Sequence, residues 1–157
     1  MILKNIIDED FTNYKKISMV LGFPYCTFKC DKECGRPVCQ NSILATAESV
    51  EISIDKIIDR YLKNGISDAI VCGGLEPMDS FDDLVALIKA FRRVSDDDVV
   101  IYTGYTEQEL SVQINILSNF KNIYIKFGRF IPDQEKHYDN TLGIYLASDN
   151  QYGKKIS

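Results

Sequence analysis

Short apolar runs alternate with amphipathic helical patterns along most of this 157-residue chain. The runs with the length and apolar character of buried strands are 17–23, 68–72, 99–102, 123–127 and 142–146. Strands that alternate with helices are typical of βαβ units and of a mainly parallel sheet. Five strands are too few to close an eight-stranded barrel. The pattern therefore predicts an α/β fold, an open or partial (β/α) barrel, in a single domain over residues 1–157 with its core at about 17–151.

Three helices have recognisable starting signals. Ser53 can cap a helix that Gly65 ends, and Ser80 can cap a second one. Thr106 and Glu109 have the spacing of a capping box at the start of a third. The apolar positions predicted to face the sheet are Ile54, Ile57, Ile58, Tyr61 and Leu62 on the first helix, and Leu84, Leu87, Ile88 and Phe91 on the second.

Length and charge disfavour several functional classes. The chain fits one domain with one core. No stretch approaches the roughly 18 apolar residues of a membrane span, and the first residues lack the pattern of a signal peptide, so a cytoplasmic location is expected. The net charge is −5 and Lys and Arg form no basic stripe, which disfavours nucleic-acid binding. The acidic run 96–98 is predicted to be a solvated turn.

Residues of unusual chemistry follow each predicted strand. In chain order these positions are Cys26, Gly73-Gly74, Thr103-Gly104, Gly128-Arg129 and Ser148. Parallel α/β sheets bind ligands at the carboxyl ends of their strands. The recurrence therefore predicts a single site at that edge of the sheet.

The cysteines are unevenly spread. Cys26, Cys30, Cys34 and Cys39 fall within fourteen positions, while Cys72 lies apart. In the expected compartment such a group indicates a metal or redox site rather than disulfides. The spacings of three, three and four intervening residues match no paired C-x₂-C zinc pattern. An iron–sulfur cluster is favoured, with structural zinc and reduced structural thiols as the alternatives.

The cysteine segment resembles that of the radical S-adenosylmethionine activases, above all the activating protein of the anaerobic (class III) ribonucleotide reductase. Their signature is C-x₃-C-x₂-C, often followed by Gln-Asn. Cys26 and Cys30 match its first pair. The resemblance implies Cys39 as the third cluster ligand, because Gln40-Asn41 follows it and 31–38 then reads as an insertion. Cys34, one position too late for the signature, is the alternative third ligand.

Two further segments resemble elements of the same family. Cys72-Gly-Gly-Leu-Glu-Pro77 is similar to its Gly-Gly-Glu-Pro element, which implies that Gly73, Gly74 and Glu76 bind the amino group of the methionine portion. A glycine turn before a helix is the structural alternative. The segment 102–106, Tyr-Thr-Gly-Tyr-Thr, implies contacts to the ribose or the carboxylate from Tyr102 and Thr103.

Two late segments complete the resemblance. Residues 127–131 resemble an Asp-Gly-x-Phe turn, and 147–151 resemble a Ser-x-Asn-Gln segment whose Ser148 and Asn150 would line the ribose and adenine side. The family usually places an aromatic residue before the third cysteine. Val38 stands there in this chain, and Phe28 is the candidate substitute. His137, the single histidine, is predicted to be a surface residue.

The resemblance implies an enzyme in which a [4Fe–4S] cluster reductively cleaves S-adenosylmethionine to a 5′-deoxyadenosyl radical. That radical would generate a glycyl radical on a partner enzyme, with electrons supplied by a flavodoxin- or ferredoxin-type donor. One alternative is a radical S-adenosylmethionine modifier of another peptide or small molecule. The other is a zinc-stabilised α/β binding module without catalysis.

Overall fold

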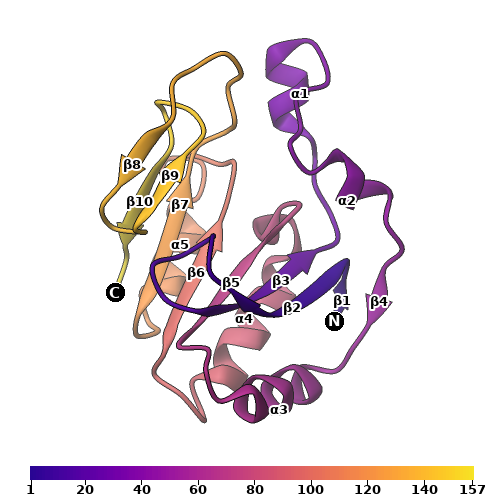
Figure 1. Cartoon of the computed structure of the whole chain (residues 1–157), viewed down its shortest axis with the longest axis vertical. Coiled ribbons are helices and arrows are strands. Elements are labelled where there is room, and N and C mark those ends of the chain that lie inside the picture. The colour runs from indigo at the N-terminus through magenta and orange to yellow at the C-terminus, as the bar shows by residue number, and fades with distance from the viewer.

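A six-stranded sheet runs through the centre of the protein in the computed structural model, which describes all residues 1–157 (Figure 1). Its strand order is β10-β7-β6-β5-β3-β2. The strands are β2 (Asn5–Asp10), β3 (Ser18–Phe23), β5 (Ala69–Gly74), β6 (Asp98–Tyr102), β7 (Ile123–Phe127) and β10 (Tyr152–Lys155). The four inner strands are parallel, and β2 and β10 are antiparallel edges. The predicted single-domain α/β fold with a mainly parallel sheet is confirmed, and its strand order is linear.

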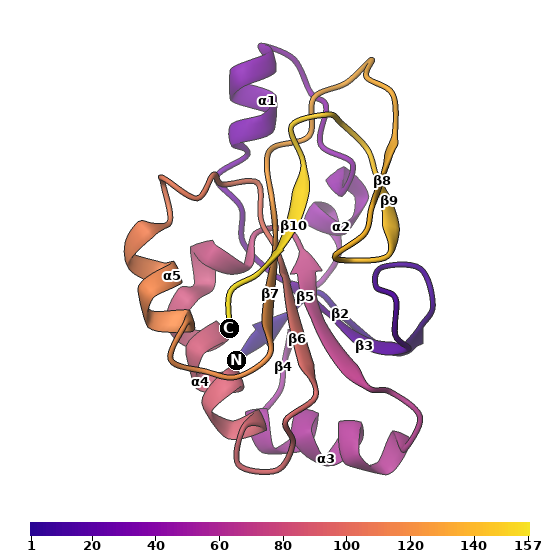
Figure 2. The same ribbon diagram turned by 90° about the vertical axis from the view of Figure 1, so that its left-hand side faces the viewer.

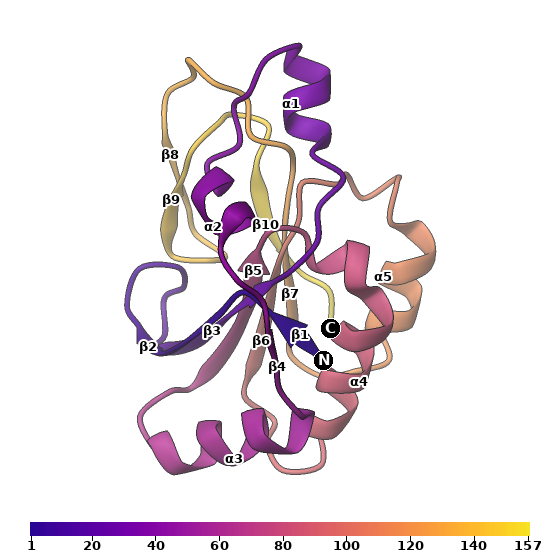
Figure 3. The same cartoon turned by 90° about the vertical axis from the view of Figure 1, so that its right-hand side faces the viewer.

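The remaining elements are short or lie outside this sheet. They are β1 (Ile2–Leu3), α1 (Lys29–Cys34), α2 (Ser42–Thr46), β4 (Val50–Glu51), α3 (Ile54–Asn64), a 3-10 helix (Pro77–Ser80), α4 (Phe81–Phe91), α5 (Ser111–Leu117), β8 (His137–Asp139) and β9 (Ile144–Leu146). Helices α3, α4 and α5 lie on one side of the sheet, and the β8–β9 pair lies on the other (Figures 2 and 3). None of the helices is long and apolar enough to cross a membrane.

The prediction of a fifth parallel strand over 142–146 is wrong. Only Ile144–Leu146 is extended, as β9, and it pairs antiparallel with β8 in a separate two-stranded sheet. A turn breaks the apolar run, because the Gly143 N–H donates to the Asp139 carbonyl at 2.8 Å and Gly143 has a φ of 72°. The carboxylate of Asp139 also accepts from the Leu142 N–H. The edge strands β2 and β10 complete the main sheet instead.

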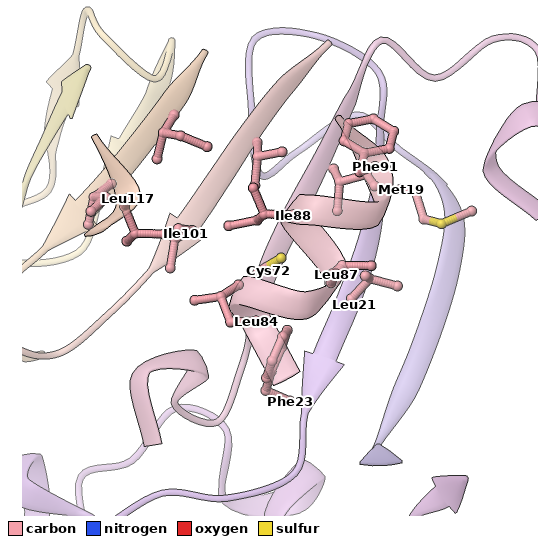
Figure 4. Packing of buried hydrophobic residues seen from close by; sticks show 14 of the residues in the cluster. Met19, Leu21, Phe23, Cys72, Leu84, Leu87, Ile88, Phe91, Ile101 and Leu117 are labelled. Carbon is pink, nitrogen blue, oxygen red and sulfur yellow. The ribbon is translucent and has the colours of Figure 1, made fainter. Parts of the chain in front are cut away.

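The main core lies between the sheet and the helices. Met19, Leu21 and Phe23 of β3 pack there with Leu84, Leu87, Ile88 and Phe91 of α4 (Figure 4). Cys72 is fully buried among these side chains, so it is a core residue set apart from the other cysteines. On α3, Ile57, Ile58 and Tyr61 are buried as predicted, but Leu62 is 51% exposed at the solvent edge of the stripe.

Helices begin directly after Ser53 and Ser80, as predicted, whereas the third helix begins at Ser111, later than the predicted start at Thr106. Two of the three predicted capping groups make their hydrogen bonds. The Ser53 hydroxyl accepts from the Lys56 N–H at the start of α3. Thr106 and Glu109 exchange the hydrogen bonds of a capping box, although regular helix begins only at α5. The Ser80 hydroxyl caps nothing, because the Glu76 carboxylate caps the preceding 3-10 helix by accepting from the Met78 N–H.

The acidic run 96–98 is only partly the solvated turn that the sequence predicts. Asp98 is buried on the sheet face opposite the helices. Its carboxylate accepts from the Tyr14 hydroxyl at 3.0 Å and lies 2.6 Å from the Lys16 ammonium. Asp98 therefore holds the β2–β3 loop, residues 11–17, against β6.

Candidate functional site

A cavity of about 260 Å³ opens at the carboxyl ends of the parallel strands. Three thiols line it, those of Cys26, Cys30 and Cys39. Among the predicted site residues, Gly74, Glu76, Tyr102 and Thr103 line the same cavity. The sheet therefore brings the cysteine segment, the glycine turn and the Tyr-Thr-Gly turn together, as the strand-end argument predicted.

The segment 31–38 folds as a compact excursion. Residues 29–34 form α1, which Gly35 ends in the left-handed conformation. The chain then turns back, and one carboxylate oxygen of Asp31 accepts from the backbone N–H groups of Val38 and Cys39, each at 2.8 Å. This clamp closes the excursion and returns Cys39 to the cavity that holds Cys26 and Cys30.

Cys34 takes a different position. It lies one helical turn after Cys30 on α1 and lines a neighbouring hollow with Cys30, Arg129 and Asn150, which does not include Cys26 or Cys39. The cavity that contains Cys26 thus has Cys39, not Cys34, as its third thiol. Cys39 as the third cluster ligand stays the prediction that follows from Gln40-Asn41.

Asn41 ties the cysteine segment to the glycine turn. Its side-chain amide donates to the Gly74 carbonyl at 2.7 Å. On the other side of the turn, the Glu76 N–H donates to the Tyr25 carbonyl at 2.8 Å. The two segments are therefore held in register. This gives a physical role to the Asn that follows Cys39.

The two glycines of the turn differ in position. Gly74 lines the cavity and has a φ of 83°. Gly73 is not part of the cavity lining, and a Cβ on it would lie 3.6 Å from the Cβ of Tyr102. The pair allows β5 to approach its neighbouring strands closely.

Glu76 is buried and lies between two backbone segments. One of its carboxylate oxygens accepts from the Met78 N–H at 3.1 Å, and the other accepts from the Gly104 N–H at 2.8 Å. Burial raises the pKa of this carboxyl to about 7, although both hydrogen bonds act in the opposite direction. Glu76 therefore links the glycine turn to the Tyr-Thr-Gly turn.

A pH-dependent stability difference follows for Glu76→Gln in the metal-free protein. Because burial favours the protonated carboxyl, Glu76 contributes its full stabilisation below about pH 4.5 and loses it as the pH rises through 7. The lost free energy of unfolding is about 3 kcal/mol. Gln cannot ionise, so the stability of the variant relative to wild type should be lowest near pH 4.5 and should increase by about that amount by pH 8. Urea unfolding at several pH values measures the difference, and a pH-independent gap would contradict the assignment.

Tyr102 and Thr103 fix the third segment. The Tyr102 hydroxyl donates to the Asn13 carbonyl at 2.5 Å and so attaches the β2–β3 loop to the cavity wall. Thr103 is buried, and its hydroxyl accepts from the Tyr105 N–H at 3.1 Å. Both side chains therefore have protein partners as well as a place in the cavity lining.

Ser148 and Asn150 do not line the main cavity. The Ser148 hydroxyl is buried and accepts from the Ile131 N–H at 3.3 Å. The Asn150 amide donates to the Arg129 carbonyl at 2.8 Å. Both hold the turn after β7, while Ala147 and Gln151 of the same segment reach the cavity.

Several lining residues were missed by sequence reasoning. They include Asn13, Lys126, Phe130 and Tyr145. Phe28 and Val38 are not part of the lining, so the aromatic side chains of this cavity are Tyr102, Phe130 and Tyr145. A signal for Lys126 existed in the alternation of β7, where positions 123, 125 and 127 are buried against the helices. The intervening positions 124 and 126 must face the other side.

The thiols lie in a setting that disfavours the uncompensated thiolate. Burial raises the pKa of Cys26 to about 11 and also raises the pKa of Cys30, and the nearby Cys39 adds to both shifts. A bound cationic core that accepts thiolates would offset this cost. No three Cys, His, Asp or Glu side chains are close enough together to hold a single metal ion. Three thiols around a shared cavity fit a group larger than one ion.

The family comparison identifies that group. A family model described as a 4Fe-4S single cluster domain matches residues 17–152, from the start of β3 into β10. The chain belongs to the 4Fe-4S single cluster domain family. The expected 4Fe-4S cluster is thereby confirmed. Cys26, Cys30 and Cys39 are the thiols that line one cavity, and their role as cluster ligands stays a prediction. No curated protein and no solved structure matches the chain.

Proposed function

We propose that this 4Fe-4S single cluster domain is a radical S-adenosylmethionine enzyme of the activase type. One observation carries the proposal: three thiols share a cavity with the glycine turn and the Tyr-Thr-Gly turn at the carboxyl edge of the sheet. Three thiolates leave one iron of a four-iron cluster without a protein ligand. The open or partial (β/α) barrel expected from the strand pattern belongs to the same proposal.

The chain's own groups divide the work. When bound, the reduced cluster supplies the electron that cleaves the sulfonium of S-adenosylmethionine into methionine and a 5′-deoxyadenosyl radical. Cys26, Cys30 and Cys39 would hold the cluster. Gly74 and Glu76 would meet the amino group of the methionine portion. Tyr102 with Thr103 would meet the ribose or the carboxylate.

The length of the chain favours a macromolecular substrate. A protein of 157 residues whose thiol cavity would already hold the cluster and the cofactor has little room to enclose a second large ligand. A backbone loop presented from outside fits this limit, which is why we propose a glycyl-radical enzyme as the partner and a flavodoxin- or ferredoxin-type protein as the electron donor.

The test is cofactor cleavage by protein reconstituted without oxygen. With dithionite as reductant, we expect 5′-deoxyadenosine and methionine to form in equal amounts, measured by liquid chromatography. Cys26→Ala is the negative control, because it removes a ligand that both ligand sets share. Protein that carries four irons per chain and forms no 5′-deoxyadenosine would refute the proposal. Appearance of a glycyl radical signal on an added partner would then test the activase assignment.

A further inference from the structure

Lys126 brings a positive charge to the cavity of the three thiols. It lies near the end of β7, and its alternating position directs the side chain to the sheet face opposite the helices. Its side chain lines the cavity with Cys26, Cys30 and Cys39. Its ammonium and a Cys30 thiolate would attract each other across this lining.

The other cations beside Cys30, those of Arg129 and Lys29, are already paired with carboxylates. The Arg129 guanidinium donates to both carboxylate oxygens of Glu109, at 3.0 and 2.6 Å, and lies 3.0 Å from Glu33. Its charge is therefore shared with two carboxylates on the outer side of the cavity.

Lys126 has no such partner. Its ammonium donates to the Gly128 carbonyl at 3.0 Å and forms no ion pair with a carboxylate. The nearby Glu76 carboxylate already accepts from two backbone N–H groups. Burial lowers the pKa of Lys126 to about 8, because desolvation disfavours the ammonium. An unpaired ammonium beside three thiols indicates an anionic occupant.

We infer that Lys126 places a positive charge beside the cluster site. Its ammonium stabilises the reduced state of the cluster and so raises the reduction potential. One electron enters the cluster from an external reductant, and the cluster with its three thiolates becomes more negative by one charge. A fixed cation in a partly desolvated site favours that state more than the oxidised one. Charge and hydrogen bonding near the sulfurs are among the factors that set the potentials of iron–sulfur clusters.

The experiment is a redox titration of the reconstituted protein, followed by electron paramagnetic resonance, without S-adenosylmethionine. Lys126→Met should shift the reduction equilibrium toward the oxidised cluster about tenfold, which equals about 59 mV for a one-electron couple. Lys126→Arg should retain most of the wild-type potential because it keeps the charge. Lys121→Met is the matched control, since Lys121 lies just before β7 at the opposite end of the strand and is exposed.

Iron and sulfide contents equal to those of wild type establish that each variant carries an intact cluster. If Lys126→Met does not retain four irons, the reduction potential of Lys126→Gln, which is also uncharged, is compared with that of wild type instead. An unchanged potential in a fully loaded, uncharged variant would overturn the inference, and so would an equal shift in Lys121→Met. Because no S-adenosylmethionine is present, the result is independent of whether the proposed cleavage reaction occurs.

Discussion

Replacing Cys39 with alanine should abolish cluster retention, whereas replacing Cys34 should leave it intact. Cys39 shares one cavity with both Cys26 and Cys30, whereas Cys34 lines a neighbouring hollow that includes Cys30 and Arg129 but not Cys26. With one thiolate of three missing, the cluster would be held by two protein ligands. Iron and sulfide analysis of protein purified without oxygen, with an optical spectrum, should give about four irons per chain in Cys34→Ala and near none in Cys39→Ala.

The two variants are matched, because both thiols are half-buried and both replacements remove the same atom. Urea unfolding of the metal-free proteins shows whether either replacement destabilises the fold. The free energies of unfolding of the two variants should differ little. The opposite pattern, cluster loss in Cys34→Ala with retention in Cys39→Ala, would contradict the ligand set. It would also remove the reason for the Asp31 clamp, which positions the Cys39 backbone by accepting from the Val38 and Cys39 N–H groups.

Local sequence signals predicted the elements on which the site depends. Four apolar runs became the four parallel strands, because strands inside a parallel α/β sheet are covered by other elements and are therefore rich in apolar residues. The fifth run failed at Gly143, where one hydrogen bond to Asp139 turns the chain within an apolar stretch. Composition favoured a strand there, and a local turn between Asp139 and Gly143 decided otherwise. The edges β2 and β10 are polar and were not predicted, since the pairing of an edge strand depends on its neighbour.

The candidate site shows the same division between local and long-range information. The predicted strand ends correctly placed Gly74, Glu76, Tyr102 and Thr103 at the site, because the carboxyl ends of parallel strands lie at the same edge of the sheet. Ser148 was expected to follow the rejected fifth strand. In the fold it supports the turn after β7 instead.

Replacing Gly74 with alanine should destabilise the protein by about 2–5 kcal/mol, through two separable effects. The φ of 83° is unfavourable for any residue with a Cβ. That Cβ would also lie 2.7 Å from the Gly22 Cα and 3.0 Å from the Phe23 nitrogen. Both are backbone atoms of β3, so relief requires the two strands to move apart. Urea unfolding of the metal-free variant measures the loss.

Gly65→Ala isolates the first effect. Gly65 ends α3 with a φ of 71°, and a Cβ there would meet no atom within 4 Å. Gly65→Ala should lower the free energy of unfolding by about 1–2 kcal/mol. The additional loss in Gly74→Ala then measures the effect of the close approach of β5 to β3. Equal losses would show that β3 yields to the added methyl group. If β3 resists as expected, Gly74→Ala should also weaken cluster retention, because the Gly74 carbonyl anchors Asn41 and thereby Cys39.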